Sequence, residues 1–225
     1  MGTLSIVATP IGNLGDITLR AIETLKNADA IFCEDTRVTA KLLARYEIKK
    51  PLVRCDEKAE EVAAKKAIDM LEGGKRIALV SDAGTPGISD PGARLVSRVR
   101  RFASSVTIEA IPGPSAITAA LSIAGLPSDE FMFLGFLPHK KGRQTALRFV
   151  AGSFVPVVLY ESPHRILKLL RELAEAAPEC RITIARELTK MHEEILVGAP
   201  LDLAAQLEAK KGVRGEFVVI IEPQK

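Results

Sequence analysis

Short apolar runs alternate with amphipathic stretches through the first half of this sequence. The apolar runs have the length of buried strands, and the amphipathic stretches carry apolar residues at helical spacing. We expect strands at 4–8, 30–33, 76–80 and 106–111, and helices at 18–26, 38–46, 58–71, 93–102 and 116–124. Strands that alternate with helices are typical of a largely parallel sheet, so the sequence predicts an α/β fold.

The pattern changes after Gly125. Strands are expected at 131–137, 155–160, 181–186, 194–197 and 216–222, with helices at 164–176 and 201–210. The last three strands have one helix among them, which predicts a mixed sheet. At about 150 residues per domain, 225 residues allow one large domain or two small ones. We place a boundary near 111–114, which gives two α/β domains, 1–112 and 113–225.

Composition excludes several classes of protein. Hydrophobic residues make up 47% and charged residues 26%, the balance of a globular protein. We expect neither a membrane-spanning helix nor a signal peptide, because no long apolar run is present. Three well-separated cysteines, outside any metal-ligand spacing, predict reduced thiols and a cytoplasmic protein. Aromatic residues are only 4%, which argues against a broad stacking surface for single-stranded nucleic acid.

The segment 81–92 joins a predicted strand to a predicted helix and contains three glycines and two prolines. In open α/β sheets, ligands bind outside the carboxyl ends of the strands, where this loop must lie. Asp82 at the strand end could accept hydrogen bonds from ribose hydroxyls or from an amine. The plainer alternative is a tight turn in which Asp90 caps the helix, with Pro91 at its first position, and we favour it for those two residues. For the loop as a whole we favour a ligand-binding role.

Segments 8–18 and 112–116 are two further loops of the same kind. Asp16 or Thr18 could cap the helix that follows the first loop. Ser115 could cap the helix after the second, or the free amides there could bind a carboxylate. Because carboxyl ends of parallel strands share an edge, we expect the three loops to meet and to bind a nucleotide-like ligand.

Charged residues follow several other predicted strands. Residues 34–37 form either a helix cap with a local ion pair or a polar site, and 139–143 form either a solvated loop or a phosphate contact. Segment 160–165 lies at the end of another predicted strand, and 185–194 carries six ionisable residues between two strands.

A set of segments then carries a resemblance to a known family, in this order: Thr9–Leu14 with Asp16–Thr18, Glu34–Arg37, Val80–Gly92, Pro112–Pro114, Gly125–Ser128, Gly135–Pro138, Tyr160–Ser162 with His164–Arg165, and Ala185–Lys190. Together they resemble the tetrapyrrole (corrin/porphyrin) methylase family over nearly the whole chain. Within it, they are most similar to the branch that methylates the 2′-O-ribose of a cytidine in 16S rRNA. Many members of that branch continue into a small extra C-terminal region, whereas this sequence stops at Lys225.

The resemblance implies two α/β domains with S-adenosylmethionine in a cleft between them, the first domain on the substrate side and the second on the cofactor side, and a homodimer. Tetrapyrrole-modifying members typically have G-x-G-P-G in the first loop. Here that loop is Ala8–Gly12, which favours an RNA substrate. Two alternatives stay open: a tetrapyrrole C-methyltransferase, and a non-catalytic cofactor-binding module associated with the ribosome.

Site residues are assigned by the same resemblance together with the charges at strand ends. The expected cofactor-binding residues are Pro10, Asp82, Gly84, Thr85, Pro86, Gly87, Ser115, Ala116, Tyr160 and Glu161. For catalysis we expect Asp35 or Glu187 as general base and Arg37 and Lys190 as partners of a phosphate or alkoxide, from a wider set that includes Asp16 and Glu34. Arg20, Lys140, Lys141 and Arg143 are expected to bind RNA phosphates in an assembled small subunit. A sulfonium methyl donor carries its own leaving group, so no metal is expected.

Overall fold

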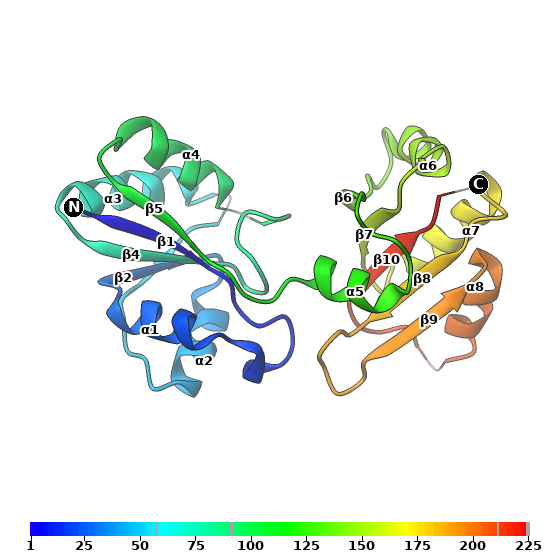
Figure 1. The fold of residues 1–225 in the computed structure, drawn as a ribbon, viewed down its shortest axis with the longest axis horizontal. Helices are drawn as coiled ribbons and strands as arrows, with labels where there is room; N and C mark the ends of the chain where they lie inside the picture. The colour runs from blue at the N-terminus through cyan, green and yellow to red at the C-terminus, as the bar shows by residue number, and fades with distance from the viewer. Residues whose placement is uncertain (57, 91, 211, 224–225) are drawn as a thin grey trace. The chain divides into compact units, whose positions relative to one another are not determined.

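A computed structural model describes residues 1–56, 58–90, 92–210 and 212–223. The chain divides into two compact units, Met1–Ser115 and Ala116–Lys225 (Figure 1). The division falls between the last strand of the first sheet and the helix that follows it, in the same connection as the predicted boundary after residue 112. All three cysteines are buried free thiols. Within the described ranges, no helix is both long enough and apolar enough to cross a membrane.

The first unit contains a parallel sheet with strand order β3-β2-β4-β1-β5. Its strands are β1 (Thr3–Val7), β2 (Ala30–Cys33), β3 (Leu52–Arg54), β4 (Arg76–Val80) and β5 (Thr107–Ile111). Its helices are η1 (Leu14–Asp16), α1 (Leu19–Asn27), α2 (Thr36–Arg45), α3 (Glu60–Glu72) and α4 (Ala93–Phe102). In Figure 1, α1 and α2 cover one face of this sheet and α3 and α4 cover the other.

Both faces of the first sheet are apolar, which explains its uninterrupted hydrophobic strands. Successive side chains of a strand point to opposite faces. Ile31 therefore packs in the core that holds Leu25 of α1, while its neighbour Phe32 packs in the core that holds Leu95 of α4. The parallel α/β architecture predicted for the first half is confirmed.

Strands β1 and β4 are neighbours at the centre of this sheet. The chain leaves β1 toward α1 on one face and leaves β4 toward α4 on the opposite face (Figure 1). The two loops therefore diverge at the carboxyl ends of their strands. This is the arrangement at which open α/β sheets bind ligands.

The second unit contains a mixed sheet, as the sequence predicts, and its strand order is β6-β7-β10-β8-β9. Strands β6 and β7 are parallel, and the remaining neighbours are antiparallel. The strands are β6 (Met132–Phe136), β7 (Val157–Glu161), β8 (Ile182–Arg186), β9 (Glu194–Gly198) and β10 (Phe217–Ile221). The helices are α5 (Ala116–Ala124), α6 (Arg143–Ala151), α7 (Ile166–Ala176) and α8 (Pro200–Glu208).

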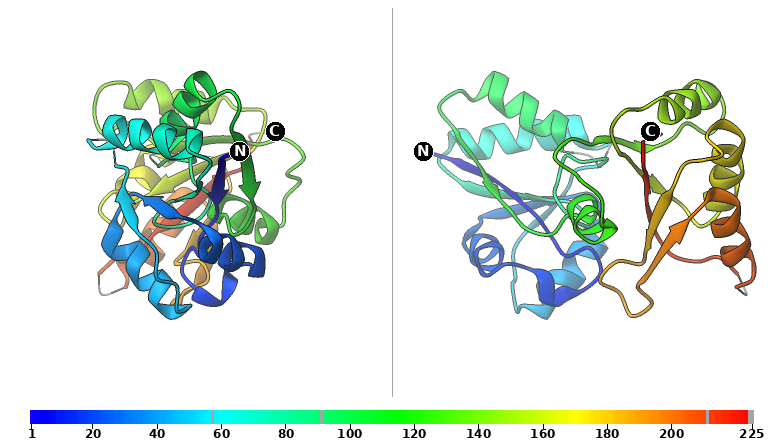
Figure 2. Two further views of the ribbon diagram at one scale, coloured as in Figure 1. Left: turned by 90° about the vertical axis from the view of Figure 1, so that its left-hand side faces the viewer. Right: turned by 45° about the vertical axis from the view of Figure 1, so that its right-hand side comes forward.

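Helices α6, α7 and α8 lie along one face of the second sheet (Figures 1 and 2). Their apolar residues share one core with alternate residues of the strands, among them Leu159 and Phe217. Helix α5 contacts β10. Three elements were not predicted: the one-turn helix η1, the short strand β3, and α6, whose first residue Arg143 lies in the segment expected as a basic loop.

Candidate functional site

The loops after β1 and β4 are joined at the carboxyl edge of the first sheet. The backbone amide of Thr9 donates to the Gly84 carbonyl at 2.9 Å, and the Gly84 amide donates back to the Thr9 carbonyl at 3.1 Å. The Thr9 hydroxyl also donates to the carbonyl of Ser81 at 3.2 Å. These bonds fix the path of both loops relative to each other.

The loop after β5 lies against the same pair of loops. The Thr85 hydroxyl donates to the Pro114 carbonyl at 3.3 Å. A Cβ on Gly113 would lie 3.0 Å from the Cβ of Ala8, so a larger residue here would have to push Ala8 away. The three glycine- and proline-rich loops that the sequence predicts at one sheet edge therefore do meet there.

The expected cofactor-binding residues of the first unit are all part of this edge or border it. Pro10, Gly84 and Pro86 are buried, while Asp82, Thr85, Gly87 and Ser115 are half-buried. Ala116, also half-buried, is the first residue of α5. The buried residues shape the loops, and the half-buried ones are those that can touch a ligand.

Asp35 adds the loop after β2 to the cluster. Its backbone amide donates to Oδ1 of Asp82 at 3.1 Å. Its own carboxylate caps α2 by accepting from the Arg37 amide at 2.8 Å, and it pairs with the Arg37 guanidinium at 2.6 Å. Hydrogen bonds from the Arg37 side chain and amide hold the pKa of Asp35 far below its usual range. Asp35 and Arg37 thus form the helix cap with a local ion pair, one of the two alternatives left open by the sequence.

Three carboxyl groups near this edge have raised pKa values. Burial raises the pKa of Glu34 and of Asp82, and the negative charges of neighbouring carboxylates add to the effect. Burial also raises the pKa of Asp90 to about 6. Carboxyl groups with raised pKa values gather at functional sites more often than elsewhere. The sequence does not reveal this set, because it depends on how deeply each loop is buried.

The predicted role of Asp90 as the cap of α4 is wrong. The residue before α4 is Gly92, and no side chain caps that helix. Oδ1 of Asp90 instead accepts from the Gly87 amide at 2.6 Å and so closes the turn within the loop. Pro91 lies outside the described residues.

A second charged cluster lies in the second unit, after β8. Oε1 of Glu187 accepts from Lys190 Nζ at 2.8 Å and from the Glu216 amide at 2.9 Å. The Lys190 ammonium also lies 2.8 Å from Oε2 of Glu216. Glu187 and Thr189 have φ of +50° and +65°, which is strained for residues with side chains. Two predicted catalytic residues, Glu187 and Lys190, are therefore in direct contact, and Glu216 is a third member that the sequence did not single out.

In this cluster, the charged partners shift the pKa values of Glu187 and Lys190 in the direction opposite to the effect of burial. Burial acts to raise the pKa of Glu187, but the Lys190 ammonium and the Glu216 amide outweigh it and the pKa is lowered. Burial acts to lower the pKa of Lys190, but the two carboxylates outweigh it and the pKa is raised. At neutral pH the cluster consists of one cation held between two anions.

Glu161 does not match its predicted role as a cofactor contact. Its side chain is fully buried, forms a 2.8 Å ion pair with Arg165 and accepts from the Ser162 amide at 2.8 Å. Arg165 in turn donates to the Leu137 carbonyl at 2.9 Å and contacts His139. Glu161 therefore anchors the loops after β6 and β7. The neighbouring Tyr160 is half-buried at the end of β7.

Arg143 does not match its predicted role as an RNA contact either. It is buried, pairs with Glu172 of α7 and donates to the Pro138 carbonyl at 3.1 Å. Its guanidinium is therefore not available to a phosphate. The other predicted RNA-binding residues, Arg20, Lys140 and Lys141, are exposed.

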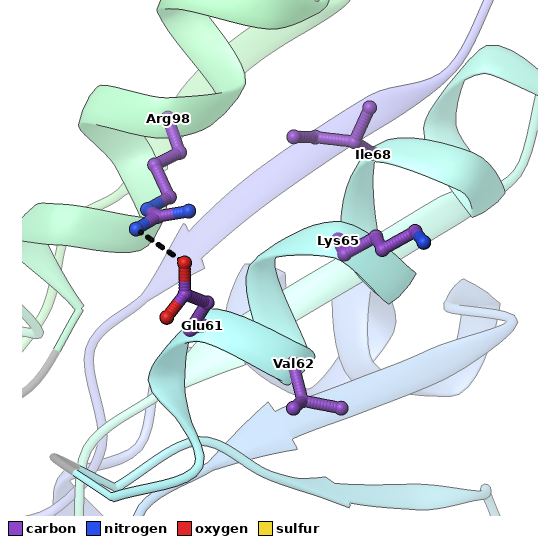
Figure 3. Close-up of a pocket in the computed structure, with 5 residues that line it drawn as sticks. All are labelled: Glu61, Val62, Lys65, Ile68 and Arg98. Carbon is purple, nitrogen blue, oxygen red and sulfur yellow. Dashed lines mark hydrogen bonds and ion pairs between the residues drawn. The ribbon is translucent and has the colours of Figure 1, made fainter.

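A shallow pocket between α3 and α4 is separate from these clusters (Figure 3). Glu61 of α3 and Arg98 of α4 point toward each other across it, 3.3 Å apart. Val62, Lys65 and Ile68 complete the lining. No predicted site residue contributes to it.

Comparison with known proteins identifies the family. Residues 3–203 match the model of the Tetrapyrrole (Corrin/Porphyrin) Methylases. The chain belongs to this family. Solved structures agree on the fold: the methyltransferase CobJ superposes with a TM-score of 0.73 at 22% identity, covering 99% of this chain and 95% of that one. Diphthine synthase superposes with a TM-score of 0.74 at 15% identity, covering 99% and 90%.

Three curated relatives share the name Ribosomal RNA small subunit methyltransferase I. The relative from Thermotoga maritima is 43% identical over 221 residues, which cover 98% of both chains. The relative from Neisseria meningitidis serogroup B is 46% identical over 225 residues, covering 99% of this chain and 76% of that one. The relative from Halalkalibacterium halodurans is 46% identical over 222 residues, covering 98% and 76%.

Proposed function

We propose that this protein transfers a methyl group from S-adenosylmethionine to the 2′-O-ribose of a cytidine in 16S rRNA of the small ribosomal subunit. Family membership and the shared name of the curated relatives support methylation of small-subunit rRNA. The observation that carries the proposal is the joined set of loops at the carboxyl edge of the first sheet, tied by the paired bonds of Thr9 and Gly84. The sugar and the nucleotide follow from the resemblance of the sequence to the ribosomal branch.

The residues at this edge fit the chemistry of S-adenosylmethionine. The cofactor offers ribose hydroxyls and an ammonium group, both hydrogen-bond donors, and the half-buried carboxyls of Glu34 and Asp82 are acceptors beside glycines that keep the surface open. Thr85 and Gly87 would complete its contacts in the first unit. When bound, the cofactor supplies an electrophilic methyl group on a sulfonium that is its own leaving group.

The second unit supplies charge suited to activating a hydroxyl. Oε1 of Glu187 accepts from Lys190 and from the Glu216 amide, and neither of these bonds involves Oε2. We assign that oxygen the role of accepting the proton of the ribose 2′-OH, and the Lys190 ammonium that of stabilising the developing alkoxide. A positioned base contributes about 10²–10⁴-fold to a rate.

Asp35 is the weaker candidate for the base. Arg37 binds both of its oxygens, so neither is open to the hydroxyl of a substrate. Glu34 beside it has a raised pKa and is better matched to neutral pH. If alanine at Glu34, Asp35, Glu187 or Lys190 lowers kcat by less than tenfold in every case, alignment of the reactants is the dominant effect and these assignments are wrong.

Recognition of the substrate rests on phosphate contacts from Arg20, Lys140 and Lys141. A net charge of +3 supplies little affinity for free RNA. We therefore propose that the substrate is rRNA folded in the assembled small subunit, read by its shape and its 2′-OH groups. By the same resemblance the enzyme acts as a homodimer, in the cytoplasm where the subunits assemble.

A methyl-transfer assay tests the function. Tritiated S-adenosylmethionine is incubated with small subunits from cells that lack the enzyme, and the label is mapped after nuclease digestion. Label on the ribose of a single cytidine is the expected result. Label on a base would refute the assignment of the ribose. Tight cofactor binding without transfer would refute the proposal and favour the tetrapyrrole methyltransferase or the non-catalytic module.

A further inference from the structure

Aromatic rings gather at the carboxyl ends of β6 and β7. Phe136 ends β6 and pairs in register with Tyr160 of β7. The ring centroids of Phe136 and Tyr160 are 5.7 Å apart, and those of Phe133 and Tyr160 are 5.0 Å apart. Phe133 and Tyr160 are half-buried, but Phe136 is 55% exposed. The cluster thus exposes the ring of Phe136 to solvent while Tyr160 packs against it.

A β-bulge explains why Phe136 points this way. The register of β6 against β7 shifts between Phe133 and Gly135, and Gly135 has φ of +60°. Without the shift, residues 133 and 136 would point to opposite faces of the sheet. The bulge brings both rings to the same tyrosine, and bulges recur where a strand must redirect a side chain.

Two arginine side chains hold the backbone of the loop that follows Phe136. Arg165, anchored by the buried Glu161, donates to the Leu137 carbonyl, and the buried Arg143, anchored by Glu172, donates to the Pro138 carbonyl. Two buried ion pairs are therefore used to fix two consecutive backbone carbonyls. The loop begins at the buried Leu137, and the five residues after it are exposed. Fixing the backbone of an exposed loop in this way points to a surface that is preorganised for binding.

Two adjacent lysines are among the exposed residues of this loop. Lys140 and Lys141 are exposed, and no carboxylate among the described residues forms an ion pair with either. The two lysines follow the exposed Phe136 by four and five positions. Such a pair of features is complementary to one nucleotide: the ring offers a face for the base, and the lysines offer charge for the flanking phosphates.

We propose that Phe136, Lys140 and Lys141 form a docking surface for a single unpaired nucleotide of the RNA substrate, with its base stacked on Phe136. This inference rests on the proposed function. It adds which part of the RNA substrate the protein holds, and through which contacts. One exposed ring serves one base, in keeping with the low aromatic content of the chain. Glu161 and Arg165 are positioning residues for this surface.

Substitutions at Phe136 test the inference in steady-state methylation of small subunits. Removing a base-stacking ring typically weakens binding by about tenfold. Phe136→Ala and Phe136→Leu should each raise KM for small subunits about tenfold, while the dissociation constant for S-adenosylmethionine, measured by calorimetry, stays within twofold. Phe136→Tyr should restore the wild-type KM. Phe154→Ala is the matched control, because Phe154 is a 93% exposed phenylalanine of the same unit.

Each other outcome has a defined meaning. A wild-type KM for Phe136→Leu would overturn the inference, because leucine keeps an apolar contact but cannot stack. A parallel loss of cofactor affinity would place Phe136 in the cofactor site, and a change in the sedimentation of the free protein would place it in a subunit interface; either result overturns the inference while leaving the function intact. If the wild-type enzyme itself fails to label small subunits, the proposed function fails and the inference fails with it.

Discussion

Replacing Gly215 by alanine would place a methyl group in the space that the Glu187 side chain fills. The new Cβ would lie 2.4 Å from Cγ of Glu187, 2.8 Å from Cδ and 2.9 Å from Oε1. These distances are too short for real contacts, so the Glu187 side chain must rotate away. Its carboxylate would then lose the bonds from Lys190 and from the Glu216 amide.

The magnitude follows from two separable costs. Gly215 has φ of +100°, and forcing a side chain into positive φ costs about 1–2 kcal/mol. Losing hydrogen bonds to a charged group adds about 1.5–3 kcal/mol. Gly212 is the matched control: its φ is +83°, and a Cβ there would meet no atom within 4 Å. Gly212→Ala should therefore show the backbone cost alone.

The assay is kcat for methylation of small subunits, with thermal unfolding measured in parallel. We expect Gly215→Ala to lower kcat by about 10²-fold, as for loss of a positioned base, and Gly212→Ala to leave kcat nearly unchanged. Glu187→Gln should reproduce the loss without the backbone cost. The reasoning is refuted if Gly215→Ala retains kcat within threefold of Gly212→Ala.

Three further predictions concern the other clusters. Because the pKa of Asp90 is raised to about 6, the folded state binds its proton more tightly than the unfolded state does, so this group's contribution to stability falls as pH rises from about 4 to 6; Asp90→Asn should flatten that part of the Tm–pH curve. Glu161→Gln leaves the Arg165 guanidinium buried without a counter-charge and should cost about 3 kcal/mol, seen as a fall in Tm, with a higher KM for small subunits. Gly113→Ala presses a methyl group against Ala8 at 3.0 Å and should weaken S-adenosylmethionine binding in calorimetry by about tenfold.

Distinct results would contradict each of these. An unchanged Tm–pH curve for Asp90→Asn would mean that burial does not perturb that carboxyl. A wild-type Tm for Glu161→Gln would show that Arg165 reaches water in solution. Unaltered cofactor affinity in Gly113→Ala would remove the loop after β5 from the cofactor site.

The architecture could be predicted because it depends on local patterns. Strands such as Ile77–Val80 are buried on both faces and read as unbroken apolar runs, and the meeting of the loops follows from the parallel direction of their strands. Strand β3 was missed because its three residues, Leu52–Arg54, are too few to show a period. Helix α6 was missed because its first turn continues a run of basic residues.

The roles of individual charged residues could not be predicted in the same way. Arg143 is buried because Glu172 lies beside it, 29 positions further along the chain. Gly215 matters because of the side chain of Glu187, which precedes it by 28 positions. Such pairings depend on how the sheet and its helices pack. The local sequence around one partner does not identify the other.

The place of β10 has a consequence for biosynthesis. This strand lies between β7 and β8 in the second sheet, yet it is made after both of them and after β9. Until residues 217–221 leave the ribosome, β7 and β8 have no strand between them, and their facing edges present unpaired amides and carbonyls. The strands of the first sheet, in contrast, are all made before residue 112, so that unit can fold while the second is still being translated. Translation would therefore leave the second unit as the one exposed to misfolding, for as long as its central strand is missing.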